Sequence, residues 1–145
     1  MVERLRVALP SERDRRLLSI LAYSGLRPGE ALALESTDVG RRTISVARAI
    51  KLVGPGDTKT HKARSISLLG VLAEGLAGID TGLILPGHDG KHWTRTAYGN
   101  WRERVWQPAC ATVRIGTITT TKIDGKTKRS YMGATPTTSA TASLR

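Results

Sequence analysis

The chain has 145 residues, a length that fits one folded domain and leaves little room for a second. Its 23 Lys and Arg residues outnumber the 12 Asp and Glu residues, and the formal net charge of +11 favours a polyanionic partner, nucleic acid before an anionic membrane. Cys110 is the only cysteine, which excludes a disulfide within the chain and a metal site built from cysteines. No segment resembles a signal peptide or a membrane span, so we expect a cytoplasmic protein.

The first 34 residues predict three helices separated by residues that stop helices. Apolar positions over residues 2–8 predict a short first helix. Ser11 is the expected N-cap of a second helix, which ends at Gly25. Pro28 suits the first position of a third helix, which we expect to run to Leu34.

The middle of the chain predicts a small antiparallel sheet of two or three strands. Residues 43–46 and 64–68 alternate between apolar and polar side chains, as half-buried strands do. Residues 47–53 are the expected partner of the first strand, and a turn is expected at residues 54–56. Residues 69–76 return to a helical pattern.

The last third is expected to begin with a loop over residues 86–91. A helix follows over residues 94–113, broken or kinked at Pro108. Residues 115–129 are rich in Thr, Lys and Gly, which predicts a hairpin or a basic loop. Residues 134–145 are small and polar and show neither a helical nor a strand period.

One local motif places an arginine between the stop of one helix and the start of the next. The segment is Ser24-Gly25-Leu26-Arg27-Pro28-Gly29-Glu30-Ala31-Leu32. An arginine at such a rigid corner, beside backbone N–H groups left free at a helix start, suits bidentate binding of a phosphate, and Glu30 is placed to brace it. The alternative is an ordinary helix corner with a solvated arginine.

A second motif, residues 57–68, places a lysine in a turn that leads into a strand. It reads Asp-Thr-Lys-Thr-His-Lys-Ala-Arg-Ser-Ile-Ser-Leu, with Lys59 in the turn. A mobile lysine near a scissile phosphate can protonate a leaving oxygen. Taken alone, the segment is more typical of a solvated basic turn.

Together, in this order, the two motifs resemble the front half of the catalytic domain of tyrosine recombinases, the phage-integrase family. The resemblance covers residues 2–76 well and residues 83–131 more loosely. It implies an α+β fold that is mainly helical, with a small antiparallel β-sheet, and it implies that residues 1–133 form a partial, truncated catalytic domain.

By this resemblance Arg27 clamps the scissile phosphate, Glu30 supports that arginine, and Lys59 is the general acid toward the leaving 5′ oxygen. Lys62 and Arg64 join Arg27 and Lys59 as expected DNA-binding residues. The implied partner is double-stranded DNA, on which full-length relatives assemble as multimers. The family's reaction passes through a covalent phosphotyrosyl link and needs neither a metal nor another cofactor.

Three catalytic elements of the family have no match in this sequence: a His-x-x-Arg box with the second arginine, a later His or Trp, and the nucleophilic tyrosine. Tyr23, Tyr98 and Tyr131 all lie ahead of the place where the second arginine is expected. We therefore expect no nucleophile among these residues, and a chain that is catalytically incomplete.

The tail suggests a reason for the missing box. Family members often carry ATPYDLRHSFAS there, and this chain continues from Ala134-Thr135-Pro136 into an unrelated run, residues 137–145. Codons exist for those nine residues that read Tyr-Asp-Leu-Arg-His-Ser-Phe-Ala-Ser when started one base earlier. The hypothesis is a one-base deletion near Pro136, which makes residues 134–145 a separate, partly out-of-frame tail. At the other end, the N-terminal DNA-clamping domain of integrases has no counterpart before Met1.

Two rival interpretations stay open. One is a non-enzymatic basic DNA-binding protein that uses the Gly25–Pro28 corner as a helix-turn-helix. The other is an integrase remnant without function. Charge by itself also fits a ribosomal-type or merely basic protein.

Overall fold

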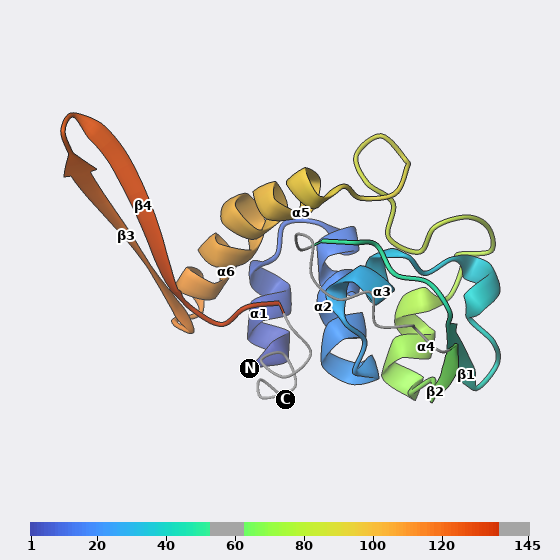
Figure 1. The fold of residues 1–145 in the computed structure, drawn as a ribbon. Helices are drawn as coiled ribbons and strands as arrows, with labels where there is room; N and C mark the ends of the chain where they lie inside the picture. The colour runs from blue at the N-terminus through green and yellow to red at the C-terminus, as the bar shows by residue number, and fades with distance from the viewer. Residues whose placement is uncertain (53–62, 137–145) are drawn as a thin grey trace.

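The computed structural model describes residues 1–52 and 63–136. Its helices form one body, with a two-stranded sheet at one end and a long hairpin that projects from the other (Figure 1). The expected α+β class is confirmed, with one difference: there are two small antiparallel sheets rather than one.

The first two helices follow the predicted capping residues. Helix α1 spans Val2–Ala8 and helix α2 spans Glu12–Ser24. The Ser11 hydroxyl accepts a hydrogen bond from the Asp14 N–H at 3.1 Å and so caps the start of α2. Gly25 ends α2 in the left-handed conformation, with φ +73°, which a residue without a β-carbon adopts at low cost.

Helix α3 spans only Pro28–Leu32, two residues less than predicted. After it, the Leu34 carbonyl accepts a hydrogen bond from the Ile84 N–H at 3.0 Å, so the chain leaves the helix to pair with a distant segment. A short 3-10 turn, η1, follows at Ser36–Asp38. Helix α3 is therefore little more than one turn, and most of its residues lie close to its N-terminal end.

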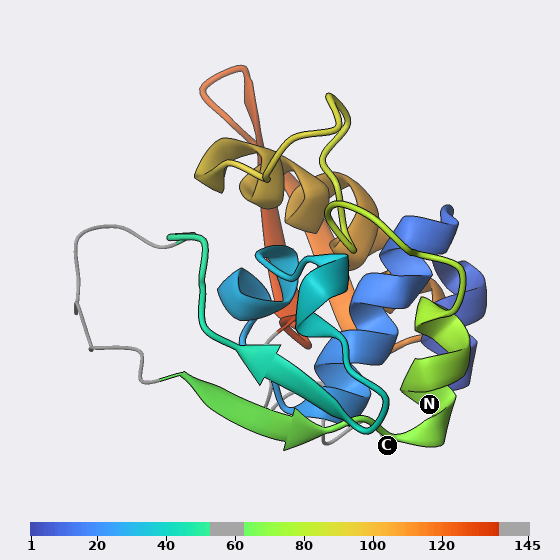
Figure 2. The same cartoon turned by 90° about the vertical axis from the view of Figure 1, so that its right-hand side faces the viewer.

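The first sheet joins β1, Thr43–Val46, to β2, Arg64–Ser67, in an antiparallel pair. Thr43 stands opposite Ser67 at one end of the pair. Helix α4, Gly70–Leu76, follows β2 as predicted and packs against α2. Figure 2 looks onto this sheet, with α4 beside it.

The prediction that residues 47–53 pair with β1 is wrong. In the described part of this segment, residues 47–52, the chain forms no strand. Instead the Ile50 N–H donates to the Gly29 carbonyl at 2.9 Å, so the segment packs on the start of α3. Its place beside β1 is taken by β2. The turn predicted at residues 54–56 lies outside the described residues.

The long helix of the back half contains a π turn. Helix α5, Arg95–Trp101, continues through the π-helical η2, Arg102–Trp106, into α6, Gln107–Thr112. Pro108 has no N–H to donate, and the wider π turn lies directly before it. The predicted helix over residues 94–113 is thus confirmed, and the irregularity near the proline is a change of helical pitch.

Residues 115–129 belong to a hairpin, which settles the choice between hairpin and basic loop. Strands β3, Gly116–Ile123, and β4, Lys126–Gly133, pair along their whole length. Asp124 and Gly125 form the two-residue turn, with φ of +47° and +72°. Positive φ at both positions matches the right-handed twist of the strands.

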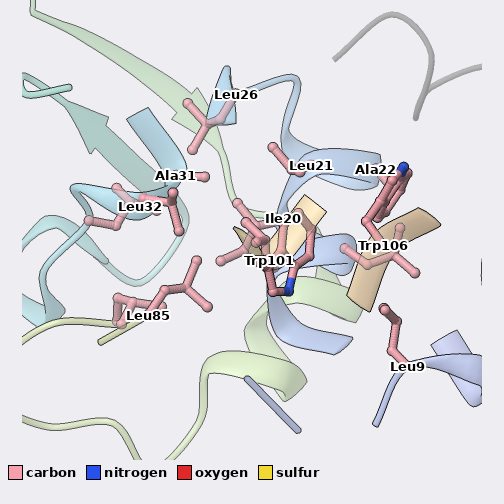
Figure 3. Close-up of a cluster of buried hydrophobic side chains, with 14 of the residues drawn as sticks. Leu9, Ile20, Leu21, Ala22, Leu26, Ala31, Leu32, Leu85, Trp101 and Trp106 are labelled. Carbon is pink, nitrogen blue, oxygen red and sulfur yellow. The ribbon is translucent and has the colours of Figure 1, made fainter. Parts of the chain in front are cut away.

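The core contains aromatic as well as aliphatic side chains. Trp93 and Trp101 meet edge to face, with ring centroids 6.0 Å apart, and Trp101 also contacts Trp106 at 5.8 Å. Figure 3 shows Trp101 and Trp106 among side chains of α2. The aliphatic part of the core is built mainly by Leu5, Leu9, Leu17, Leu18, Ile20, Leu21, Leu26, Leu32, Ile44, Leu72, Ile84 and Leu85. Of the helices that the structure describes, none is both long and apolar enough for a membrane crossing.

Candidate functional site

The corner between α2 and α3 is fixed by its main chain. The Leu26 side chain is fully buried just before it, and Pro28 occupies the first turn of α3 just after it. Between them Arg27 is the N-cap, with an extended backbone at φ −72° and ψ 151° that suits a residue before proline. The chain therefore presents this arginine from a position with little backbone freedom.

Both main-chain polar groups of Arg27 are occupied. Its N–H donates to Glu30 Oε2 at 2.9 Å, and its carbonyl accepts from the Ala31 N–H at 2.9 Å. The Arg27 N–H is therefore not among the N–H groups left free at the helix start, and Pro28 has no N–H to offer. The Arg27 side chain is exposed, and no ion pair of the described residues includes it. The free cation at the corner is the guanidinium.

Gly29 allows another segment to approach the corner closely. A β-carbon at this position would collide with the carbonyl oxygen of Ile50, whose N–H bonds to the Gly29 carbonyl. The glycine therefore holds residues 47–52 against the start of α3. This packing brings the segment that follows β1 to the first turn of α3, two residues after Arg27.

Glu30 is the buried anion of the site, and its partner is Arg64 in β2. Arg64 Nη1 donates to Oε1 at 2.8 Å and Nη2 donates to Oε2 at 2.9 Å, a bidentate pair. The Glu30 side chain is 4% exposed and that of Arg64 is 44% exposed. Glu30 thus supports Arg27 through the main chain, while its carboxylate faces the guanidinium of Arg64.

The two arginines shift the titration of this carboxylate. Burial would raise the pKa of Glu30, but the hydrogen bonds from Arg64 and from the Arg27 N–H, with the positive charges of both arginines, outweigh it. The pKa of Glu30 lies below its ordinary value of 4.5 as a result. The hydrogen bond to Glu30 in turn raises the pKa of Arg64. Both groups are charged at neutral pH.

The structure therefore brings three of the predicted site residues together: Arg27, Glu30 and Arg64. Glu30 Oε2 accepts from both arginines, so the Arg27 main-chain nitrogen and Arg64 Nη2 lie within two hydrogen-bond lengths of each other. Arg64 keeps its Nε and the outer N–H groups of its guanidinium for another acceptor. Lys59 and Lys62 lie outside the described residues.

Tyr23 is partly buried against the core, and the other two tyrosines are held by specific contacts. Tyr98 is 7% exposed, stacks on Trp101 with centroids 5.8 Å apart, and has its pKa raised to about 12 by burial, against the opposing charge of Arg102. The Tyr131 hydroxyl donates to the Ala134 carbonyl at 2.7 Å, and burial followed by its hydrogen bond with Cys110 raises its pKa. Neither hydroxyl is free to attack a phosphate.

A second buried carboxylate, that of Asp14, joins two helices. Asp14 accepts from Trp101 Nε1 at 2.9 Å and also from the Ser11 hydroxyl at 2.6 Å. These bonds tie the start of α2 to α5 and leave this carboxylate a structural role. Across residues 1–52 and 63–136, no group of three His, Cys, Asp or Glu side chains is arranged to hold a metal ion.

Neither the family models nor the curated proteins that were compared with this chain contain a match.

The Glu30–Arg64 pair is the relationship that sequence reasoning missed. The sequence predicts Arg64 only as a DNA-binding residue, and a separation of 34 positions gives no local signal of contact. Two features of the sequence are consistent with it: a carboxylate in the first turn of an otherwise apolar helix, and a basic residue that begins a strand. Only the packing of the sheet beside α3 joins them.

Proposed function

We propose that this chain binds the phosphate backbone of double-stranded DNA as a tyrosine-recombinase-type catalytic module, with Arg27 as its central phosphate ligand. Arg64 is the second ligand, and Lys59 and Lys62 complete the set according to the family resemblance. The observation that carries the proposal is that one buried carboxylate, Glu30, accepts from both the Arg27 main-chain N–H and the guanidinium of half-exposed Arg64, next to an exposed Arg27 side chain that no ion pair of the described residues includes.

The arrangement suits a phosphate for a physical reason. Glu30 neutralises part of the charge of Arg64 and fixes its plane, which lowers the entropy lost when the outer N–H groups bind an anion. Arg27 adds a full positive charge from a rigid corner. Two arginines that both reach one phosphate would also stabilise the extra negative charge of a pentavalent phosphorane.

The helix-turn-helix alternative has less support from the geometry. Helix α3 has five residues, about one and a half turns, and Glu30, Ala31 and Leu32 are buried. A recognition helix must present several side chains to base edges in the major groove. A short helix that is largely buried offers few such positions, so we favour contact with the backbone.

Cleavage is not expected from these 145 residues alone. The resemblance supplies Arg27, Glu30 and Lys59 for the phosphate and the leaving oxygen, but no match to the nucleophile or the second arginine. Incubation with a nicked duplex, followed by denaturing electrophoresis, should show no covalent protein–DNA adduct. An adduct that is lost in Tyr23→Phe would overturn this part of the proposal.

Binding is tested by fluorescence anisotropy with a labelled duplex of about three helical turns at about 50 mM salt. Arg27→Ala should weaken binding about fivefold to tenfold, and Arg27→Lys should fall between, because lysine keeps the charge but loses the bidentate geometry. Arg4→Ala is the matched control: Arg4 is an exposed arginine of α1, and no ion pair of the described residues includes it. Equal losses in Arg27→Ala and Arg4→Ala would contradict the proposal.

A further inference from the structure

The β3–β4 hairpin projects from the body as a two-stranded ribbon (Figure 1). Each strand has eight residues, so the ribbon is about 26 Å long at the usual rise per residue. Residues 119–130 are all exposed, and Ile123 at the tip is 52% exposed. A ribbon without a packed face is marginal in water, which points to a partner that covers it.

The base of the hairpin is held on η2 and α6. The Ala134 carbonyl accepts two hydrogen bonds, from Trp106 Nε1 at 2.8 Å and from the Tyr131 hydroxyl at 2.7 Å. The Tyr131 ring lies over Gly116, where a β-carbon would stand 2.5 Å from the tyrosine oxygen. The Ile115 N–H bonds to the Cys110 carbonyl at 2.9 Å. The orientation of the ribbon is therefore set by the body, while its outer half stays uncovered.

The outer half is basic on both faces. Residues that face each other across the strands share a face, so Lys128 opposite Thr121 and Lys126 opposite Ile123 lie on one face. Arg129 opposite Thr120 and Lys122 opposite Thr127 lie on the other. Asp124 is the one carboxylate in this hairpin. No ion pair that the structure describes neutralises any of these four cations.

We propose that the β3–β4 hairpin is a second DNA contact, a β-ribbon that lies in a groove of double-stranded DNA. The proposal rests on the proposed function for the identity of its partner. A two-stranded ribbon fits the width of the major groove, which is about 12 Å. Lysine and arginine side chains from both faces then meet the phosphates of the two groove walls, and the threonine hydroxyls between them donate to phosphate oxygens or base edges.

The presence of cations on both faces of the ribbon favours a DNA groove over the other possible partners. A ribbon that lay flat on an anionic membrane or on an acidic protein would need its cations on one face, whereas here both faces carry them. Pairing with a second copy would bring two ribbons of net positive charge together, and lysines at a strand edge oppose such pairing. A groove with phosphates on both sides accounts for both observations.

The test replaces the three lysines of the ribbon and compares two triple variants of equal charge. Lys122→Gln/Lys126→Gln/Lys128→Gln removes three ribbon cations, and Arg4→Gln/Lys91→Gln/Arg95→Gln removes three exposed cations from the body. None of the six forms an ion pair with a described residue, so both variants should fold. The full chain is titrated against duplex DNA in parallel with Arg27→Ala, and circular dichroism checks the fold of each.

We expect the ribbon variant to bind about tenfold more weakly than wild type at about 100 mM salt, and the body variant to change less than threefold. Equal losses in the two triple variants would overturn the ribbon proposal. A loss in Arg27→Ala with none in the ribbon variant would overturn the ribbon alone, and the reverse would overturn the Arg27 site alone. Wild type that does not bind DNA would overturn both. Stronger binding of a duplex RNA of the same sequence would also overturn the ribbon proposal, because the deep, narrow major groove of A-form RNA does not admit a ribbon.

Discussion

Arg64 donates two hydrogen bonds to Glu30, at 2.8 and 2.9 Å, across 34 positions of sequence. The bond joins strand β2 to the first turn of helix α3. Because the carboxylate is buried and also accepts from the Arg27 N–H, it holds the sheet, the helix start and the corner in one arrangement. Stability and the proposed phosphate binding therefore depend partly on the same residues.

Removal of Arg64 should destabilise the fold. Arg64→Ala leaves a buried carboxylate without its main partner, and we expect a loss of about 2 kcal/mol in the free energy of unfolding. Arg42→Ala, an exposed arginine just before the same sheet, is the control and should change the free energy by less than about 0.5 kcal/mol. Urea titration followed by tryptophan fluorescence measures both. Similar small changes in the two variants would show that the pair contributes little.

The stability of the protein should depend on pH through Glu30. Its pKa is lowered in the folded state, so near and below 4.5 the unfolded chain binds more protons than the folded one at this residue. The stabilisation is fully present above the unfolded pKa and is lost as the pH falls through the lower, folded value. The difference in unfolding free energy between wild type and Glu30→Gln should therefore be constant at neutral pH and shrink in acid. A difference that grows in acid would have the wrong sign for this assignment.

Two glycine-to-alanine changes should have opposite effects. Gly29→Ala places a methyl group against the Ile50 carbonyl, and the resulting shift of backbone should cost about 1–3 kcal/mol. Gly99→Ala in α5 meets open space and removes freedom from the unfolded chain, so it should stabilise by about 0.5–1 kcal/mol. Thermal unfolding of both variants tests this. A neutral Gly29→Ala would mean that residues 47–52 do not pack on α3 as described.

Local features of the fold could be predicted where one residue type dictates the backbone. Ser11, Gly25 and Pro28 mark helix ends through their own side chains or their φ preferences, and the structure has the helix ends there. The Asp124-Gly125 turn likewise supports a hairpin in the basic segment. Such signals depend on neighbours in sequence, so they survive without knowledge of the tertiary structure.

Long-range pairings could not be predicted in the same way. The sequence predicts residues 47–53 as the partner of β1. The alternation of apolar and polar side chains marks a strand but does not identify the strand that pairs with it, and in the structure that strand is β2. Residues 47–52 instead pack on Gly29. The Glu30–Arg64 contact follows from this pairing, since Arg64 begins β2. The candidate site was thus predicted as residue types, while its geometry needed the packing.

The single thiol should report on unfolding. Cys110 is fully buried, and burial raises its pKa to about 11, so at pH 8 about one thousandth of the thiol is ionised even when reagent can reach it. We expect iodoacetamide to modify the folded protein far more slowly than a short cysteine peptide, and as fast as the peptide in strong denaturant. Labelling of the native protein at the peptide's rate would contradict the burial of Cys110 on α6, next to the hairpin base.

The most direct test of DNA-backbone binding at the corner is the salt dependence of affinity. A plot of log K against log salt for duplex DNA should be steeply negative for wild type, and its slope should become shallower by about 0.9 in Arg27→Ala, as expected for one lost phosphate contact. Arg4→Ala should keep the slope of wild type. An Arg27→Ala variant with the affinity and slope of wild type would show that the free guanidinium at the corner does not bind phosphate.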